Sequence, residues 1–400
     1  MPPSAGPGAR RLVATRALRG LVDGLVSVVL PAYLTALGWS GTEIGALTAA
    51  TMLGSAVLTL AVGLWGGGFD PRRLLLAMTA LMLVTGIAFF GVRALWPLMA
   101  VAVVGTLNPS SGDVTPFLPI EQALVSGTVS ADDRTALFAR YNLGGALAGA
   151  LGALASGAFG AKGVVDPDVA RWAFMAYAAA ALGLFALYLG LVPQPVAAHA
   201  RGRFGLRRSR RVVAELAALF SIDAFGGGLV VQSLLALWLW RRFELAPATA
   251  AAVFFAAGVL TAFSQLVSAR IAARIGLIRT MVYTHLPSNV LLVGAAFMPT
   301  APLAVAFLLA RMALSQMDVP ARQAYVMRVV EPDERAAAAT LTSVPRSLTA
   351  AVAPLVTGAL LDVTSFGWPL IAAGGLKIVY DLLLLWRFHA SERAEAPADP

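Results

Sequence analysis

Twelve apolar segments, each long enough to cross a lipid bilayer as a helix, follow one another along almost the whole chain. The hydrocarbon core of a bilayer is about 30 Å thick, and a helix of about 20 apolar residues spans it. Backbone groups must be paired inside the hydrocarbon, and a helix pairs them within itself. The sequence therefore predicts an all-α integral membrane protein whose transmembrane helices lie at 13–37, 44–66, 73–93, 96–126, 136–159, 171–192, 212–240, 248–270, 277–298, 301–328, 336–361 and 367–388.

The composition leaves little room for a soluble domain. Charged residues make up 13% of the 400 residues and hydrophobic residues 58%, whereas soluble domains carry about 25% charged residues. The net charge of +9 does not indicate a nucleic-acid partner, because the arginines lie in short loops between the apolar segments. The absence of cysteine excludes disulfides and thiolate sites, and the three scattered histidines predict no metal site.

The basic residues predict the orientation in the membrane. With the N-terminus in the cytoplasm, about twenty Lys and Arg residues lie on the cytoplasmic side and about five outside, as the positive-inside rule requires. Arg10, Arg11, Arg16 and Arg19 precede an apolar run and so imitate a signal peptide, but Asp23 interrupts that run and no small-residue cleavage site follows. We therefore expect an uncleaved, monomeric, multi-pass protein of the cytoplasmic (inner) membrane with both termini in the cytoplasm.

The chain contains an internal repeat. Shifted by about 201 residues without gaps, 119–158 aligns with 320–359, and about a third of the aligned positions are identical, including Pro, Gln, Asp, Arg and Gly in the same order. A polar, arginine-rich segment separates two sets of six apolar segments. The sequence therefore predicts two pseudo-symmetric six-helix bundles and a cytoplasmic basic linker, at 1–192, 212–400 and 193–211 respectively.

This arrangement resembles the major facilitator superfamily over nearly the whole chain. The loop 66–73 is similar to the family's Gly…Asp-Arg…Arg-Arg motif, and 269–279 is its weaker counterpart in the second half. The segments 132–134 and 333–337 are similar to the Glu-Arg-Ala segments that open spans 5 and 11 of the family. The pattern Arg-Ser-Leu…Ala-Pro…Gly at 346–358 looks like one common in bacterial efflux members. The resemblance implies a secondary transporter that works by alternating access.

Two features differ from the drug–proton antiporters of this family. Those proteins usually carry an arginine at membrane level in span 4, where this chain has 108–113. Their Gly-Pro signature in span 5 is incomplete, because 144–157 contains the glycines without the proline. The spacing of Gly145 and Gly149 predicts close helix packing.

A stretch of the fourth segment, 108–122, predicts a broken helix. It contains three prolines, and each removes a backbone N–H and clashes with the preceding turn. At membrane depth, freed backbone groups and a buried aspartate are tolerated where they line a cavity. We therefore predict that Asn108 and Asp113 bind substrate or a coupling ion, or that Asp113 caps the second half-helix. The tenth segment repeats this arrangement with the candidates Arg311, Gln316 and Asp318. An internal ion pair between the first and last of these is the alternative.

Further charges are embedded in the predicted spans. Asp23 and Asp223 lie about eight to twelve residues into their helices. An aspartate there costs several kcal/mol unless it is paired or protonated, so both are candidate coupling residues. Structural pairing with an arginine of the same half is the alternative. Arg346 has no partner close in sequence and is a candidate for an anionic group or a distant carboxylate. Lys377 and Asp381, spaced i,i+4, predict a structural pair.

The resemblance also implies a latch at the cytoplasmic rim. Asp70, Arg72 and Arg73 would pair with the other half in one access state only, which biases the equilibrium. Glu121 and Arg140 are further candidates for a pair at this rim. The alternative for the arginines is a role in membrane topology alone.

These observations predict a secondary active transporter of a small molecule. We expect proton-coupled efflux of a small organic or amphipathic compound, with uptake or exchange of an anionic metabolite as the alternative. A non-transporting membrane sensor or scaffold is an alternative of another class. No nucleotide-binding loop, nucleophile motif or cofactor signature is present in the sequence, so an enzyme is not expected. The expected partners are the lipid bilayer, the substrate and protons.

Overall fold

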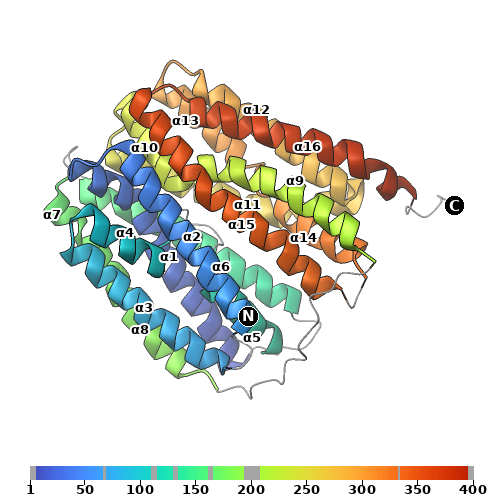
Figure 1. Cartoon of the computed structure of the whole chain (residues 1–400), viewed down its shortest axis with the longest axis horizontal. Helices are drawn as coiled ribbons and strands as arrows, with labels where there is room; N and C mark the ends of the chain where they lie inside the picture. Colours follow the sequence, from blue (N-terminus) through green and yellow to red (C-terminus); the bar gives the residue numbers. More distant parts are fainter. Residues whose placement is uncertain are drawn as a thin grey trace. The chain divides into compact units, whose positions relative to one another are not determined.

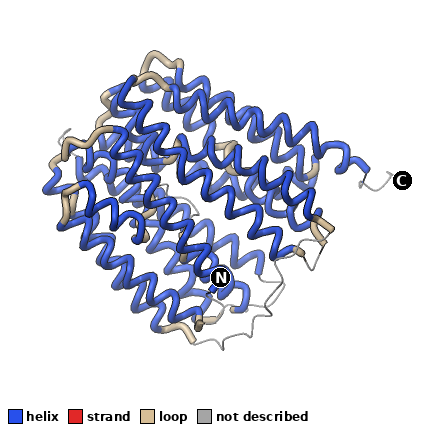
Figure 2. The backbone as a smooth tube through the Cα atoms, viewed as in Figure 1, coloured by secondary structure: helices blue, strands red, loops and turns tan. Residues whose placement is uncertain are grey.

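The computed structural model describes residues 6–65, 69–109, 115–128, 134–160, 165–192, 208–331 and 334–394. Within these residues every regular element is a helix (Figure 2). Nine helices in the described part are long and apolar enough to cross a membrane, and two shorter apolar helices accompany them. The predicted all-α membrane fold is confirmed, and the helices are consistent with twelve spans.

Figure 1 shows the helices in chain order. A short 3₁₀ helix (Ser156–Gly160) follows α6. The α-helices are α1 (Pro7–Ala36), α2 (Gly41–Trp65), α3 (Pro71–Gly91), α4 (Leu95–Val104), α5 (Phe117–Gly127), α6 (Arg134–Ala155), α7 (Pro167–Ala170), α8 (Trp172–Leu189), α9 (Arg210–Leu229), α10 (Gln232–Phe243), α11 (Pro247–Ile275), α12 (Leu277–Ala296), α13 (Ala301–Met312), α14 (Asp318–Val329), α15 (Arg335–Val363) and α16 (Trp368–Ala394).

The fourth predicted span is broken into α4 and α5. Helix α4 ends at Val104, and α5 begins at Phe117 directly after Pro116. The break predicted from the prolines is therefore confirmed. Asp113, which falls in 110–114, lies outside the described residues.

The seventh and tenth predicted spans are also divided. Helices α9 and α10 are separated at 230–231, after a run of three glycines that weakens the helix. Helices α13 and α14 are separated at 313–317, a segment that forms turns. Broken helices in a membrane protein expose backbone groups that require polar partners, so polar side chains or ligands are expected at these breaks.

The described chain forms two compact units. Unit 1 consists of Met1–Gly202, Val231–Val259 and Pro354–Ser365, and unit 2 of Arg203–Val230, Leu260–Ala353 and Phe366–Pro400. Unit 1 therefore contains parts of both predicted six-span halves. The halves themselves, and the linker, of which 193–207 lie outside the described residues, stay a prediction from the repeat.

Unit 1 is organised around α1, which packs against α6, α8 and α10. Glycines allow the approach of α6: a Cβ on Gly20 would lie 2.4 Å from the carbonyl oxygen of Gly145, and a Cβ on Gly24 would lie 2.0 Å from that of Gly149. The close packing predicted from the glycines of the fifth span is thus confirmed, and its partner is α1. In the same unit α3 and α8 run side by side (Figure 1).

Unit 2 is organised around α12, which packs against α13, α14 and α16, while α16 also packs against α9 (Figure 1). Its apolar core includes Phe220 on α9, Tyr325 on α14 and Tyr380 on α16. Burial of such large aromatic side chains between the helices fixes which helix faces meet. These contacts bring polar residues of α9, α12, α14 and α16 together.

We predict that Gly24→Ala lowers the thermal unfolding midpoint in detergent, whereas Gly375→Ala leaves it unchanged or raises it. The added methyl group of Gly24→Ala would meet a backbone carbonyl that no side-chain rotation can clear, at a cost of about 1–3 kcal/mol. Nothing lies within 4 Å of a Cβ at Gly375, where alanine gains helix propensity. Equal midpoints for the two variants would contradict the close approach of α1 and α6.

Candidate functional site

The segment that follows α4 leads to a buried carboxylate on α1. The backbone of this segment is held by Tyr177 of α8, whose hydroxyl donates a hydrogen bond to the carbonyl oxygen of Thr106 at 2.8 Å. Two residues later, the side chain of Asn108 hydrogen-bonds to Asp23. Both side chains are buried, with 3% and 5% of their surface exposed. The two residues that the sequence analysis selected in spans 1 and 4 therefore meet.

Asp23 has no ion pair with any described residue within 4 Å, although Arg16 and Arg19 of the same helix act on it from a greater distance. Arg19 is engaged elsewhere, because its Nη2 donates to Glu121 at 2.8 Å. A buried carboxylate that has an amide partner and no ion pair within 4 Å among the described residues is destabilised when ionised and stabilised when protonated. This environment suits a group that takes up and releases a proton.

Glu121, on α5, has the opposite environment. Its carboxylate accepts hydrogen bonds from Thr15 at 2.7 Å, from Tyr188 at 2.6 Å and from Tyr141, in addition to the bond from Arg19. Glu121 is fully buried. Three hydroxyl donors and one cation satisfy both carboxylate oxygens, which favours the ionised form. Glu121 therefore joins α1, α5, α6 and α8 instead of pairing with Arg140, which is exposed.

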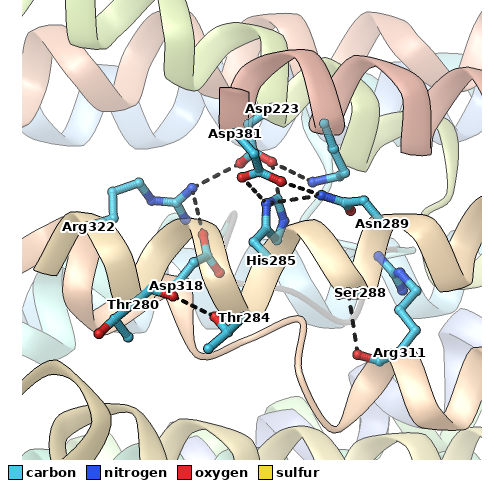
Figure 3. Close-up of polar contacts among 11 residues, drawn as sticks. Asp223, Thr280, Thr284, His285, Ser288, Asn289, Arg311, Asp318, Arg322 and Asp381 are labelled. Atoms are coloured by element: carbon cyan, nitrogen blue, oxygen red, sulfur yellow. Dashed lines mark hydrogen bonds and ion pairs between the residues drawn. The ribbon is translucent and has the colours of Figure 1, made fainter. Parts of the chain in front are cut away.

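Unit 2 contains a second buried charge cluster, centred on Asp223 of α9 (Figure 3). Lys377 of α16 donates to Asp223 at 2.6 Å, and Arg322 of α14 donates to it at 2.9 Å. Arg322 also lies 3.3 Å from Asp318, four residues earlier on α14. All four side chains are at most 8% exposed. Asp223 is therefore the shared counter-ion of two cations from different helices.

The cluster continues through α12, which the sequence analysis did not select (Figure 3). Nδ1 of His285 lies 2.9 Å from Asp381, and its Nε2 lies 3.7 Å from Asp223. Asn289 donates to the second oxygen of Asp381 at 2.9 Å. The predicted pair between Lys377 and Asp381 is wrong, because each of these side chains binds a different helix. A polar His and Asn spaced i,i+4 in an apolar span was the sequence signal for this site.

The two clusters occupy related positions in the internal repeat. A shift of 201 residues places Glu121 on Arg322, and a shift of 200 residues places the first-span Asp23 on Asp223. In the first half, an arginine of the first span binds a glutamate of the fourth. In the second half, an aspartate of the seventh span binds an arginine of the tenth. The same link between equivalent helices is therefore made with exchanged charges.

The remaining candidates in unit 2 lie around the break of the tenth span. Asp318 binds Arg322 rather than Arg311, so the internal pair considered from the spacing is not formed. Gln316 is half-buried in the turn between α13 and α14. Arg346, on α15, is half-buried, and its carbonyl oxygen accepts from Thr349 at 3.0 Å. In the described residues, no group of three His, Asp or Glu side chains is arranged to hold a metal ion.

The residues of the expected cytoplasmic latch make local contacts in unit 1. Asp70 caps α3 by accepting from the backbone N–H of Arg72 at 3.0 Å. The guanidinium of Arg72 donates to the carbonyl oxygen of Leu189 at the end of α8, at 2.6 Å. Arg73 is exposed. These contacts join the connection before α3 to α8 within the first half.

An unexpected polar contact joins the two sequence halves inside unit 1. Asp362, at the end of α15, accepts from the backbone N–H groups of Gly41 and Thr42 at 2.5 and 2.7 Å, and so caps α2. Arg241 of α10 donates to Asp362 at 3.0 Å and to the carbonyl oxygen of Leu361 at 2.7 Å. Nothing in the sequence near residue 362 indicates this partner, which lies more than three hundred residues away along the chain.

Comparison with known proteins gives the family. A model of the Major Facilitator Superfamily matches residues 12–317 and 216–400. The chain belongs to this superfamily. An uncharacterized membrane protein of Saccharomyces cerevisiae is 24% identical to it over 413 residues, which cover 93% of this chain and 92% of the yeast protein.

Solved structures of superfamily members share the fold. The nucleoside transporter NupG gives a TM-score of 0.75 at 14% identity and covers 95% of this chain and 100% of its own. The xylose transporter XylE from E. coli gives 0.74 at 13% identity, with 95% and 96% covered. At such identities the likeness shows the fold alone. The protein is thus a multi-pass membrane protein with the fold of superfamily transporters, and its family points to transport rather than enzymatic activity.

In this superfamily member, the buried Arg19–Glu121 pair should respond to mutation as a unit. We predict that Arg19→Met or Glu121→Gln alone lowers the unfolding free energy in detergent by about 3–5 kcal/mol, because each leaves its partner buried and unpaired. The double variant should lose less than the sum of the two. Chemical unfolding monitored by tryptophan fluorescence would measure all four corners of this cycle.

The exposed pair of Arg93 with Asp168 is the matched control. Arg93→Gln should change the unfolding free energy by less than about 1 kcal/mol, since solvent screens the pair. Strict additivity of the two buried substitutions would contradict the coupling.

Proposed function

We propose that the protein is a proton-coupled secondary transporter that exports a small organic compound by alternating access. The observation that carries the coupling is the environment of Asp23, a buried carboxylate that has an amide partner and no ion pair in the described part of the chain. Family membership supports the transport itself. The predicted orientation, with both termini in the cytoplasm, tells which end of the protein opens to the cytoplasm and which end opens to the outside.

Asp23 is a better proton carrier than the other buried carboxylates. Glu121 is held ionised by one cation and three hydroxyl donors, and Asp223 by two cations. Protonating either of these would break an ion pair and leave a buried cation, which is costly. Protonating Asp23 instead removes a buried charge. A carrier must release its proton at another stage, and access of water to Asp23 in one state would permit that.

Alternating access requires contacts that form in one state and break in the other. We infer that the cap of α2 by Asp362 is such a contact, at the predicted outer end of the protein. A second polar contact between the sequence halves supports it, since Gln232 of α10 donates to Ser27 of α1 at 3.0 Å. The Asp362 contacts lie near the surface, where a helix cap is worth about 0.5–2 kcal/mol. Contacts of this strength can close a gate and still be released.

Export is proposed because the segment 346–358 resembles efflux members of the family. In this mechanism a proton enters on Asp23 as substrate leaves, and the halves 1–192 and 212–400 rock about the substrate site. The competing mechanism is a uniporter or exchanger without protons, in which Asp23 is structural. The two mechanisms differ in whether substrate movement is accompanied by proton flux.

We predict that Asp23→Asn abolishes substrate-dependent proton flux, because an amide cannot carry the proton. The purified protein would be placed in liposomes with an enclosed pH dye and challenged with small organic compounds. The control Asp166→Asn removes an exposed helix-capping carboxylate and should keep the flux. Substrate movement without proton flux in the wild type would exclude coupling.

We predict that Asp362→Asn shifts the protein toward a state open at the α2 end. The chain has no cysteine, so a cysteine pair at the exposed residues Ala36 and Val363 can carry spin labels without a background signal. The distance distribution between the labels should gain a longer component in the variant.

The matched control for the gate is Glu43→Gln. Glu43 accepts from the backbone and hydroxyl of Ser40, three residues away, so this carboxylate makes a local contact only. Its removal should leave the label distances unchanged. Identical distributions for the wild type and Asp362→Asn would remove Asp362 from the gate.

A further inference from the structure

Arg311 is a buried cation that forms no ion pair within 4 Å among the described residues. It lies in the last turn of α13, just before the break of the tenth span, and is 9% exposed. Its Nη1 reaches the sulfur of Met312 at 3.4 Å, which is a weak acceptor, and its buried Nε has no hydrogen-bond partner. The backbone carbonyl oxygen of Arg311 is satisfied, since it accepts hydrogen bonds from Leu314, Ser315 and Ser288. The unsatisfied group is the guanidinium.

The carboxylates near this region are already engaged. Asp223 binds Lys377 and Arg322, and Asp318 binds Arg322. Asp381 binds His285 and Asn289 (Figure 3). Each acid of the cluster therefore has a polar partner within 4 Å, and none of these partners is Arg311, on which Asp223 acts from a greater distance.

The fold offers Arg311 little compensation. The C-terminal end of α13 carries a partial negative charge, which favours a cation in the last turn but by far less than the cost of burying it. Residues that destabilise the protein and make no stabilising contact in return are typical of binding sites, where the ligand supplies the missing interaction. A guanidinium presents a planar fork of donors that matches a carboxylate or a phosphate.

We infer that Arg311 binds the negatively charged group of the transported compound, which is therefore a small organic anion. This inference rests on the proposed transport function and specifies the substrate class. A buried acceptor on the adjacent helix fits the same site: Oδ1 of Asn289 has no hydrogen-bond partner. Asn289 follows Ser288, whose hydroxyl contacts the backbone of Arg311 at 3.4 Å. An anion with a nearby N–H or O–H donor would satisfy both.

The first test needs no knowledge of the substrate. If Arg311 is an uncompensated charge in the empty protein, then Arg311→Gln should raise the unfolding midpoint in detergent by about 2 °C or more. Arg322→Gln is the matched control, because it removes a buried arginine that two carboxylates require. It should lower the midpoint. A fall in the midpoint of Arg311→Gln comparable to that of Arg322→Gln would overturn the inference, because Arg311 would then be a structural cation.

The second test uses probes of matched size and different charge. Benzoate and phenylphosphate, at millimolar concentration, should raise the midpoint of the wild type, whereas neutral benzamide should not. Protection should be lost in Arg311→Gln and weakened in Arg311→Lys, which keeps the charge but not the planar fork. Absence of protection by both anions, or equal protection of the wild type and Arg311→Gln, would overturn the inference.

The two proposals can fail separately. Asp23→Asn should keep anion protection, since binding in detergent requires no proton flux. Loss of proton flux in Asp23→Asn together with anion protection that survives Arg311→Gln would leave the proposed transport standing and reject Arg311 as the anion site. Anion protection that depends on Arg311 in a protein without proton flux would reject coupling and keep the site.

Discussion

The pairing of buried charges controls how the helices of this protein associate. An ion buried without a partner costs several kcal/mol, whereas a well-paired ion is close to neutral. Glu121 of α5 therefore has to lie against the arginine of α1, and Asp223 of α9 has to lie against the cations of α14 and α16. Apolar side chains in a lipid environment gain little by choosing one helix over another. These polar contacts, together with the close glycine packing of α1 and α6, provide the specificity that hydrophobic burial alone does not.

Both halves of the internal repeat contain an ion pair between equivalent helices, but the positive and negative partners are exchanged. Glu121 and Arg322 occupy aligned positions, and each binds the first helix of its own half. Asp23 and Asp223 also align, but Asp23 faces an amide and Asp223 faces two cations. The environment therefore separates two identical residues into a candidate proton carrier and a structural counter-ion. The exchange of charges makes the two sides of the repeat chemically different.

Contacts of different strength suit different parts of a transporter. The buried clusters contain ions at 2.6–3.3 Å from their partners and are at most 8% exposed, and they join helices to one another. The cap of α2 by Asp362 lies near the surface and consists of hydrogen bonds that water can replace. A contact of the second kind is the one that can open and close. Arg311 belongs to neither kind, because it is buried and its charge is unpaired among the described residues.

The sequence by itself determined the membrane class, the helices and the break of the fourth span, because hydrophobic length and proline act locally along the chain. It also selected Asp23, Asn108 and Asp223, since an embedded polar residue is conspicuous in an apolar segment. Only the tertiary structure decided their partners. It paired Lys377 with Asp223 rather than with Asp381, brought His285 into the cluster, and placed Asp362 on α2. Helical periodicity gives the face of a helix on which a residue lies, but the helix that meets that face depends on the packing of segments far apart in the chain.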